Sequence, residues 1–425
     1  MLSGWGARTS ASPRDSRNRR PRADTGATAL NQQYRLAALI SHPIQYFAPL
    51  YRRLAREPDI DLTVYYSSHR GVEPYLDPGF GQRFRWDVSL LDGYRHRFLP
   101  NAGQGEAGFA SLVNPAIVPE LTRNRFDALW IHGHNHATNL LALAAARLVG
   151  TRVMMRGETH LGLKRPGWKL RLRRPLMTAL YRLCDACLPI GTRNADFYRY
   201  HGVGEGKLFM VPYTVDNDFF TTSVERYRQN MARVREELGI RPNRPVILFA
   251  SKLIPRKRPF DLLRAYHAIT VQGVEATLLF VGSGEEEPRL RRYVQDHQLA
   301  DVLFPGFQNQ TELPRFYALA DLFVLPSEDE PWGLVINEVM CAGLPVIATR
   351  EIGAVADLVR HGHNGLLYDT GDVDTLSAHL HALVKDADLR ARMGANSRAI
   401  IDGWGLDQSV AGIRAALARL KGRIE

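Results

Sequence analysis

The stretch PSEDEPWGLVINEVMCAGLPVIA, residues 326–348, decides our interpretation of the fold. The apolar run before it, residues 321–326, predicts a buried strand that ends in a cluster of acidic residues. A helical pattern then begins near Gly333, and Gly343 and Pro345 are typical of its end. Residues 346–348 predict another strand. The sequence therefore predicts a strand, a polar loop, a helix and a second strand, which is a unit of an α/β sheet.

Two acidic residues flank the predicted helix start: Glu330 lies in the loop before it and Glu338 lies within the helix. The first turn of a helix has unpaired N–H groups and a partial positive charge, so it accepts a phosphate group readily. Carboxylates accept hydrogen bonds from hydroxyl groups. This arrangement suits a phosphate with polyols on both sides, such as a nucleotide sugar. The alternative is an ordinary βαβ unit with two solvated acids.

The composition sets broad limits on the class of protein. A chain of 425 residues predicts two domains, and 45% apolar and 23% charged residues are typical of a soluble globular protein. No apolar run approaches the ~18 residues that span a bilayer. Residues 1–33 carry six Arg and two Asp with no apolar segment, so we expect a disordered basic leader and no signal peptide. Three cysteines favour a reducing compartment, and we expect a cytoplasmic protein.

The net charge of +11 favours anionic partners: nucleic acid, anionic lipid or a phosphorylated substrate. The sequence contains no pattern typical of a recognition helix, an aromatic RNA-binding sheet or paired metal knuckles. We therefore expect no nucleic-acid partner.

Short apolar runs alternate with helical stretches through two parts of the chain, residues 34–222 and 240–405. This alternation predicts two doubly wound parallel sheets of the Rossmann type, with ligands bound at the carboxyl ends of the strands. Between them, residues 222–244 read as a charged, helix-like linker. We expect residues 67–112 to be irregular, residues 208–211 to form a strand, and a C-terminal helix in residues 406–425 to pack back on the first domain.

Basic residues follow the first strand of the second domain. Lys252 and Lys257 lie where a diphosphate would meet the neighbouring helix start, although a basic loop is often only a solvated surface. The next strand ends in Val281-Gly-Ser-Gly284. Gly-x-Gly alone is a weak signal, and a tight turn explains Gly282 at least as well as the close approach of a phosphate or base.

These motifs together resemble the catalytic half of the group-one retaining glycosyltransferases with the GT-B fold. The family's pair of glutamates separated by seven residues corresponds to Glu330 and Glu338, and its basic pair corresponds to Lys252 and Lys257. Three further motifs occur in the family's order, beginning at Val281, Pro305 and His363. The resemblance covers residues 205–400 and extends more weakly into the first half.

The resemblance implies transfer of a sugar from a nucleotide-diphosphate sugar, with retention of configuration, to a glycan, lipid-linked or small-molecule acceptor. Glu330 would contact the donor sugar and Glu338 the ribose, while Lys252 and Lys257 would neutralise the leaving diphosphate without a metal or other cofactor. Other donor contacts would come from the loop and helix start: Gly333, Leu334, Val335, Gly282 and Ser251. Such an enzyme would serve polysaccharide or glycolipid assembly.

Two other kinds of function stay open. One is a nucleotide-sugar epimerase or a phosphorylase on the same fold. The other is a basic protein that binds a membrane or nucleic acid and keeps only a vestigial nucleotide site.

The chain departs from the family pattern at several positions. Ser251-Lys252 replaces the usual Gly-Arg, which removes a guanidinium that binds phosphate through two hydrogen bonds. His42-Pro-Ile-Gln-Tyr46 replaces the usual glycine pair after the first strand. We expect His42 and Gln45 to take over part of the role of these glycines in the cleft.

Polar residues follow two further strands of the first domain. His132-Gly-His134-Asn-His136 could line the acceptor cleft, be structural or hold a metal, and no acid-and-histidine set completes a metal motif. By resemblance, His134, Glu158 and His160 are candidates for acceptor contacts. Asp216-Asn-Asp218 mimics a metal motif but reads as a turn, and Cys184 and Cys187 read as buried thiols.

Residues 164–174 combine four Arg and two Lys with a Trp in a helix-like segment. Basic residues interleaved with apolar ones can rest on an anionic lipid surface, and a solvated helix face is the alternative. A peripheral association with the inner face of the membrane is therefore one expectation from the sequence.

Overall fold

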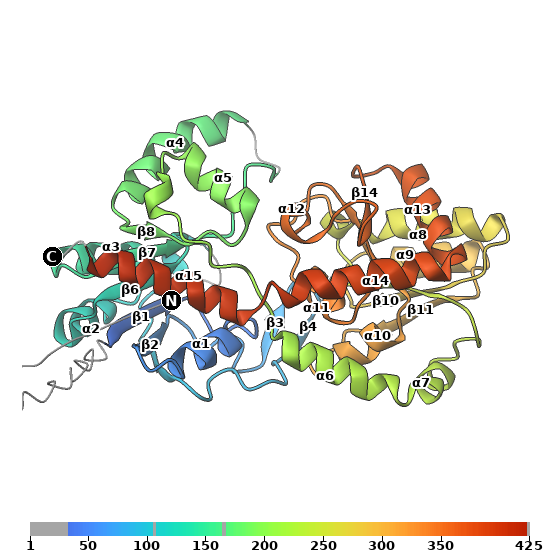
Figure 1. Ribbon diagram of the computed structural model, residues 1–425, viewed down its shortest axis with the longest axis horizontal. Coiled ribbons are helices and arrows are strands. Elements are labelled where there is room, and N and C mark those ends of the chain that lie inside the picture. The colour runs from blue at the N-terminus through green and yellow to red at the C-terminus, as the bar shows by residue number, and fades with distance from the viewer. Residues whose placement is uncertain (1–32, 105–107, 164–166, 423–425) are drawn as a thin grey trace, which may run out of the picture. The chain divides into compact units, whose positions relative to one another are not determined.

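The computed structural model describes residues 33–104, 108–163 and 167–422, so the basic leader expected in residues 1–33 lies almost wholly outside the described residues. Residues 33–425 cluster as one compact unit. Two parallel sheets organise this unit, as the alternation of apolar runs predicts (Figure 1).

The first sheet has the strand order β5-β2-β1-β6-β7-β8 within the described residues. Its central strands are nearly continuous runs of buried apolar side chains, as expected for strands covered by helices on both faces. The strands are β1 (Tyr34–Ile40), β2 (Ile60–Tyr66), β5 (Arg95–Phe98), β6 (Ala128–His132), β7 (Arg152–Arg156) and β8 (Ala186–Cys187). The helices along this part of the chain are α1 (Phe47–Ala55), α2 (Ile117–Asn124), α3 (Ala137–Leu148), α4 (Gly167–Arg182) and α5 (Thr192–Tyr200), with the 3-10 turns η1 (Phe109–Ser111) and η2 (Glu205–Lys207).

The second sheet repeats this order as β11-β10-β9-β12-β13-β14. Its strands are β9 (Val246–Ala250), β10 (Thr277–Val281), β11 (Val302–Gly306), β12 (Leu322–Leu325), β13 (Val346–Thr349) and β14 (Gly365–Tyr368). The associated helices are α8 (Pro259–Val271), α9 (Glu287–Asp296), α10 (Leu313–Leu319), α11 (Val335–Cys341), α12 (Val355–Leu358), α13 (Val373–Lys385) and α14 (Ala387–Asp402), with the 3-10 turn η3 (Pro255–Lys257). Every pairing within the two sheets is parallel.

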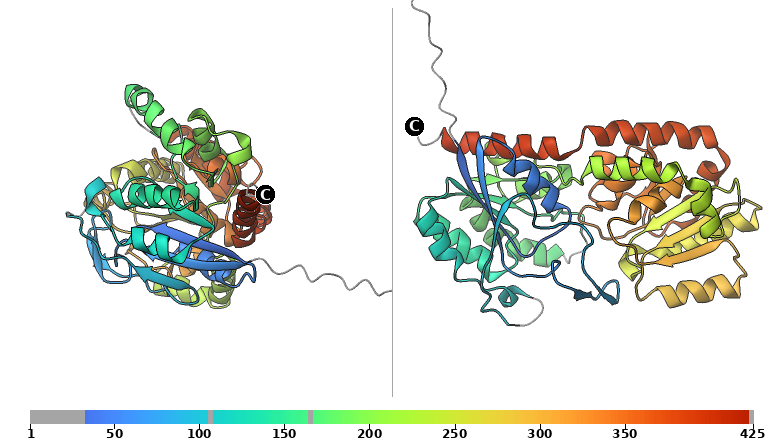
Figure 2. Two further views of the ribbon diagram at one scale, coloured as in Figure 1. Left: turned by 90° about the vertical axis from the view of Figure 1, so that its left-hand side faces the viewer. Right: turned by 90° about the horizontal axis from the view of Figure 1, so that it is seen from below.

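Two helices occupy the segment between the sheets, α6 (Asn217–Arg228) and α7 (Met231–Glu237). The chain ends in α15 (Leu406–Lys421), which lies beside α1 of the first half. Figure 2 shows α14 and α15 following one another, so the C-terminal helices run from the second sheet back to the first.

Three expectations about local structure are wrong. Residues 67–112 contain the edge strand β5, paired with β2, and a hairpin of β3 (Tyr75–Asp77) and β4 (Gln82–Phe84). Residues 208–211 make only an isolated bridge to β8, because Pro189 has no N–H with which to continue the ladder. Asp216 caps α6 by accepting the N–H of Phe219, so this segment begins a helix and is not a turn.

Candidate active site

The strand order locates the site. In each sheet the strands that follow the first one are added first on one side of it and then on the other. We call the place where the order reverses the switch point. Ligands of such folds bind at the carboxyl ends of the two strands that flank it. In the first sheet these strands are β1 and β6, and in the second sheet they are β9 and β12. The predicted residues Lys252 and Lys257 follow β9, and Glu330 follows β12.

Lys257 and Glu330 form an ion pair at the second switch point. Both residues are buried, at 7% and 9% exposure, and Arg256 stands 3.5 Å from the same carboxylate oxygen. Burial lowers the pKa of Lys257, and the carboxylate of Glu330 opposes that shift. A lysine and a glutamate that contact each other from neighbouring strand ends are placed to act on one ligand.

His160, from the loop after β7, holds the backbone of Glu330 across the two halves. Its Nδ1 accepts the N–H of Gly162 at 3.1 Å, so its Nε2 carries the proton and donates to the carbonyl of Glu330 at 3.1 Å. His160 is buried at 3% exposure. In this structure it positions the Glu330 loop.

Glu338 is buried on α11 at 1% exposure. The hydroxyl of Tyr46 donates to one carboxylate oxygen at 2.9 Å, and the hydroxyl of Tyr317 donates to the other. Burial raises the pKa of Glu338 to about 7, although both hydrogen bonds favour the charged form. Two hydroxyl donors therefore occupy the carboxylate to which the resemblance assigns the ribose hydroxyls.

Lys252 bonds to Asp77, at the end of β3 in the first half, with 2.7 Å between the ammonium and the carboxylate. The Phe80 ring lies under the same ammonium at 4.7 Å, and Ser283 donates to the Phe80 carbonyl at 2.9 Å. Phe80 and Phe84 also pack against Phe307, with ring centroids 4.7 and 4.6 Å apart. We name residues 75–87 the arm, because this segment of the first half reaches the second-half loops that follow β9, β10 and β11.

The glycines at the end of β10 have a structural explanation. A Cβ on Gly282 would stand 2.0 Å from the carbonyl oxygen of Ser251, and one on Gly284 would stand 2.4 Å from that of Leu253. Both also have positive φ angles. The close approach of the 251–253 backbone therefore suffices to explain Gly282, Gly284 and the position of Ser251.

The remaining predicted donor contacts surround the start of α11. Gly333 and Leu334 precede the helix, and Val335 is its first residue. The helix has seven residues, and Glu338 lies in its first turn. These residues lie at the carboxyl side of β12, in the same loop and helix as Glu330.

A cavity of about 560 Å³ lies at the carboxyl end of the first sheet. His134 and Glu158 line it, together with Arg156 at the end of β7. Pro331 also lines it, so the neighbour of Glu330 forms part of its wall. The structure thus brings two of the predicted acceptor residues together beside the Glu330 loop.

A buried charged group lies at the bottom of this cavity. Arg156 is 2% exposed, and its guanidinium lies 5.2 and 5.1 Å from the ring centroids of Phe47 and Tyr213. It donates to the carbonyl of Val211. Burial raises the pKa of Glu158, while Arg156 and a hydrogen bond from Tyr213 oppose the shift. The cavity therefore offers both a cation and a carboxyl group to a ligand.

His42 and Gln45 lie after β1, and within the described residues they form no hydrogen bond or ion pair with Lys252, Lys257 or Glu330. His42 Nδ1 lies 2.9 Å from the hydroxyl of Ser41, and burial, with Arg70 and His136 nearby, lowers the pKa of His42 to about 4. Gln45 is 8% exposed beside Tyr46.

The three-histidine segment shows no metal site. His132 lies 3.0 Å from the hydroxyl of Tyr51, and burial lowers its pKa well below the ordinary value. Among residues 33–104, 108–163 and 167–422, no group of three or more His, Cys, Asp or Glu side chains is arranged to hold a metal ion. Cys184 and Cys187 are buried free thiols, as the sequence predicts.

Sequence reasoning missed the residues that bond to the predicted ones. Asp77 lies in a stretch without apolar periodicity, and no local signal connects it to Lys252. Tyr46 belongs to the segment His42-Pro-Ile-Gln-Tyr46, which stands in place of the glycine pair of the resembled family, and this departure is a signal in the sequence. Tyr317 and Arg156 lie within predicted elements and read as ordinary helix and strand residues.

Part of the chain matches a known protein family. Residues 230–400 match the family described as glycosyl transferases group 1. These residues of the second half are therefore similar to a group 1 glycosyl transferase domain. The match includes Lys252, Lys257, Glu330 and Glu338, so these four residues after the strands of the second sheet all lie within the matched residues.

Curated relatives match part of this chain over part of their own length. The sulfoquinovosyl transferase SQD2 of Arabidopsis thaliana is 27% identical over 67% of this chain and 55% of its own length. The N-acetyl-alpha-D-glucosaminyl L-malate synthase of Bacillus anthracis is 32% identical over 40% of this chain and 44% of its own. The chain spans about half the length of the curated relatives it matches.

Solved structures share the fold over nearly the whole chain. Anabaena HepE in complex with UDP covers 91% of this chain and 100% of its own, at 18% identity and a TM-score of 0.70. Sucrose-phosphate synthase from Thermosynechococcus elongatus covers 92% and 100%, at 17% identity and a TM-score of 0.65. The GT-B fold that the sequence predicts is confirmed.

Proposed function

We propose that this chain is a retaining, metal-independent glycosyltransferase that moves a sugar from a nucleotide-diphosphate sugar to an acceptor bound in the first half. The observation that carries the proposal is the buried pair of Lys257 and Glu330 at a strand switch point, beside the cavity that His134 and Glu158 line. The names of the relatives, which include an N-acetyl-alpha-D-glucosaminyl L-malate synthase and a phosphatidylinositol monomannoside mannosyltransferase, support the same reaction class.

Each residue has a role in the proposed reaction. Glu330 accepts hydrogen bonds from the donor sugar, and Glu338 binds the ribose once Tyr46 has moved away. Lys257 and Lys252 neutralise the charge that develops on the departing diphosphate, which is the part of the transition state where fixed cations accelerate the step. Because two ammonium groups supply this charge, the proposal needs no metal.

The acceptor approaches from residues 34–222, and residues 240–405 bind the donor. A hydroxyl of a glycan, a lipid-linked sugar or a small molecule enters the cavity beside Glu158 and attacks the anomeric carbon held near Glu330. The hydroxyl arrives on the face from which the diphosphate leaves, and its proton passes to the departing diphosphate oxygen as the bond from the anomeric carbon to that oxygen breaks. The new glycosidic bond therefore keeps the original configuration.

The test is turnover of donor by the Glu330→Gln variant. Glutamine keeps the size of glutamate and one hydrogen-bonding oxygen but removes the charge. We therefore expect a folded protein that consumes the donor at least 100-fold more slowly, which corresponds to about 3 kcal/mol in the activation free energy. A thermal-shift panel over uridine, guanosine and adenosine diphosphate sugars identifies the donor first, and the anomeric coupling of the product by NMR reports retention. Wild-type turnover in the variant contradicts the role of Glu330.

Two outcomes favour the other candidate functions. Conversion of the donor into an isomer or a sugar phosphate, without an added acceptor, indicates an epimerase or a phosphorylase. A chain that no nucleotide or nucleotide sugar stabilises is a binding protein with a vestigial site.

A further inference from the structure

Helix α4 presents an apolar stripe to solvent. Trp168, Leu172 and Leu176 are 64%, 72% and 68% exposed, and their spacing of four residues puts them on one face of the helix. The opposite face packs inward, because Met177 and Tyr181 are 5% and 3% exposed. Figure 1 shows α4 at the outer edge of the first half.

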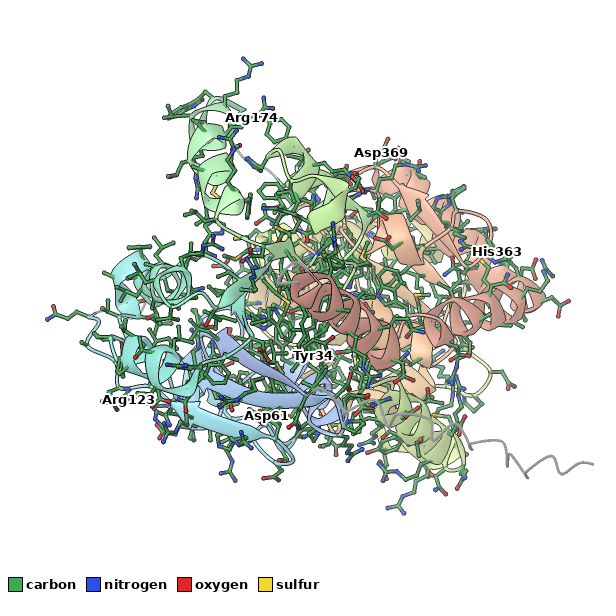
Figure 3. The ribbon with its side chains drawn as sticks, turned by 60° about the vertical axis from the view of Figure 1, so that its left-hand side comes forward. Tyr34, Asp61, Arg123, Arg174, His363 and Asp369 are labelled. Carbon is green, nitrogen blue, oxygen red and sulfur yellow. The ribbon has the colours of Figure 1, made fainter. Side chains whose placement is uncertain are left out.

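Arginines border the stripe on both sides. Arg171 and Arg173 are the chain neighbours of Leu172, and at about 100° per residue they project to either side of it. Both are exposed, as is Arg174, which Figure 3 labels on this helix. Residues 167–182 contain no Asp or Glu, so no acidic side chain of the helix itself offsets these charges.

We propose that this face of α4, which we name the α4 face (Trp168, Arg171, Leu172, Arg173 and Leu176), docks the protein on an anionic lipid bilayer. An apolar stripe bordered by cations matches the boundary between acyl chains and anionic headgroups, where the leucines and the tryptophan enter the apolar layer and the arginines meet phosphate groups. Among the described residues, no helix has the length and apolar character to cross a bilayer, so the α4 face would lie on the surface.

The chemistry of the α4 face favours a membrane over the other polyanions. A nucleic acid presents phosphates but no continuous apolar layer in which three large side chains could be buried. Exposed apolar side chains at four-residue spacing match the acyl-chain layer of a bilayer, and the cations on both flanks match its anionic headgroup layer.

The same helix forms part of the wall of the site. Arg173 and Met177 line the 560 Å³ cavity together with His134 and Glu158. A bilayer against the α4 face would therefore lie next to the proposed acceptor cavity. It follows that the acceptor is lipid-linked, with its headgroup entering past Arg173. This conclusion about the acceptor rests on the proposed function, whereas the docking on a bilayer does not.

The experiment is co-sedimentation of the full chain with vesicles. We expect binding to phosphatidylcholine vesicles that contain 30% phosphatidylglycerol, at least tenfold weaker binding to pure phosphatidylcholine, and weakening of the anionic binding as salt rises. The double variant Leu172→Ser/Leu176→Ser and the single variant Arg171→Ser should each reduce binding at least fivefold. Val271→Ser and Arg264→Ser, on exposed positions of α8, are the matched controls and should bind as the wild type does.

The outcomes separate docking from catalysis. Thermal stabilisation by the nucleotide sugar should be unchanged in the α4 variants, because the donor residues lie in the second half. Equal sedimentation of the wild type and the double variant, equal binding to both kinds of vesicle, or displacement of the protein from anionic vesicles by an equal phosphate concentration of RNA each overturns the proposal. If the α4 variants lose sedimentation and the wild type transfers no sugar, the docking is supported and only the proposed function is refuted.

Discussion

Glu338 carries a buried carboxyl group whose pKa is raised to about 7, mainly by burial. Its unfolded-state value is close to 4.5, so between these two pH values the folded chain binds the extra proton. Stability therefore falls as pH rises from about 4.5 to 7, and the cost of burying the charged form is fully present above 7. Glu338→Gln removes this titration, so we expect the variant to gain stability relative to the wild type between pH 5 and pH 8.

The difference corresponds to about 3 kcal/mol at most, because each pKa unit is worth about 1.4 kcal/mol. The measurement is the melting temperature of both proteins across that pH range. Tyr317→Phe is the control. It removes a hydrogen bond that favours the charged form of Glu338, so the stability of this variant should depend more steeply on pH than that of the wild type. Parallel curves for wild type and Glu338→Gln would show that this carboxyl does not titrate in the range.

Lys257 and Glu330 should depend on each other for stability. Lys257→Met leaves the buried carboxylate of Glu330 paired only with Arg256, at 3.5 Å, among the described residues. Removing one member of a buried ion pair costs about 3–5 kcal/mol. The double variant Lys257→Met/Glu330→Gln leaves no buried charge in the pair, so we expect it to be more stable than the single variant. Urea unfolding of the four proteins of the cycle measures the coupling, and additive losses would contradict it.

At this scale the sequence predicts which residues lie together at the strand ends of the second sheet but not what they contact. Lys252, Lys257 and Glu330 follow apolar runs, and parallel strands bring their carboxyl ends to one edge, so their proximity follows from the fold. The bonds from Asp77 to Lys252 and from Tyr46 to Glu338 join residues 175 and 292 positions apart. Such contacts depend on how the two halves meet, and no pattern along the chain contains that information.

The arm is the element that stands between the two halves at the donor side. Asp77→Asn removes the carboxylate that holds Lys252, so a diphosphate no longer competes with a resident anion. A partly exposed pair of this kind is worth up to about 1 kcal/mol, and we therefore expect the Michaelis constant for the donor to fall about two- to fivefold with little change in kcat. Initial rates over a donor titration measure both constants.

Asp87→Asn is the matched control on the same arm, because Asp87 accepts hydrogen bonds from Thr311 and does not contact Lys252. An unchanged Michaelis constant in Asp77→Asn, or an equal decrease in both variants, would mean that the bond from Asp77 does not compete with the donor.

Elements with strong apolar periodicity are those that the sequence predicts well. β1, β6, β9, β10 and β12 are buried runs and appear close to the expected places. β5 was missed because Arg95-His-Arg-Phe98 alternates exposed and half-buried positions at a sheet edge, with no apolar run. The arm was missed for a related reason: its aromatic residues pack against Phe307 of the other half, so their burial depends on a distant segment.

The whole unit is joined by α15, which belongs to the end of the chain but packs on the first half. Leu417 and Ile413 are 1% and 0% exposed, and α15 contacts α1. Ser409 donates to the carbonyl of Pro212 at 3.0 Å, and Arg414 pairs with Asp59 beyond α1. The first half therefore completes its core with a helix that follows the second sheet in sequence.

Leu417→Ala should consequently destabilise the first half although the residue lies near the C-terminus. Removing a buried leucine leaves a cavity and costs about 2–5 kcal/mol. Because α15 packs on α1, we expect faster amide hydrogen exchange in residues 47–55, whereas β9 and β10 of the second sheet keep wild-type protection. Arg419→Ala, an exposed position on the same helix, is the control and should leave exchange unchanged. Faster exchange in the second sheet but not in residues 47–55 would show that α15 stabilises its own half, and that the first half folds without it.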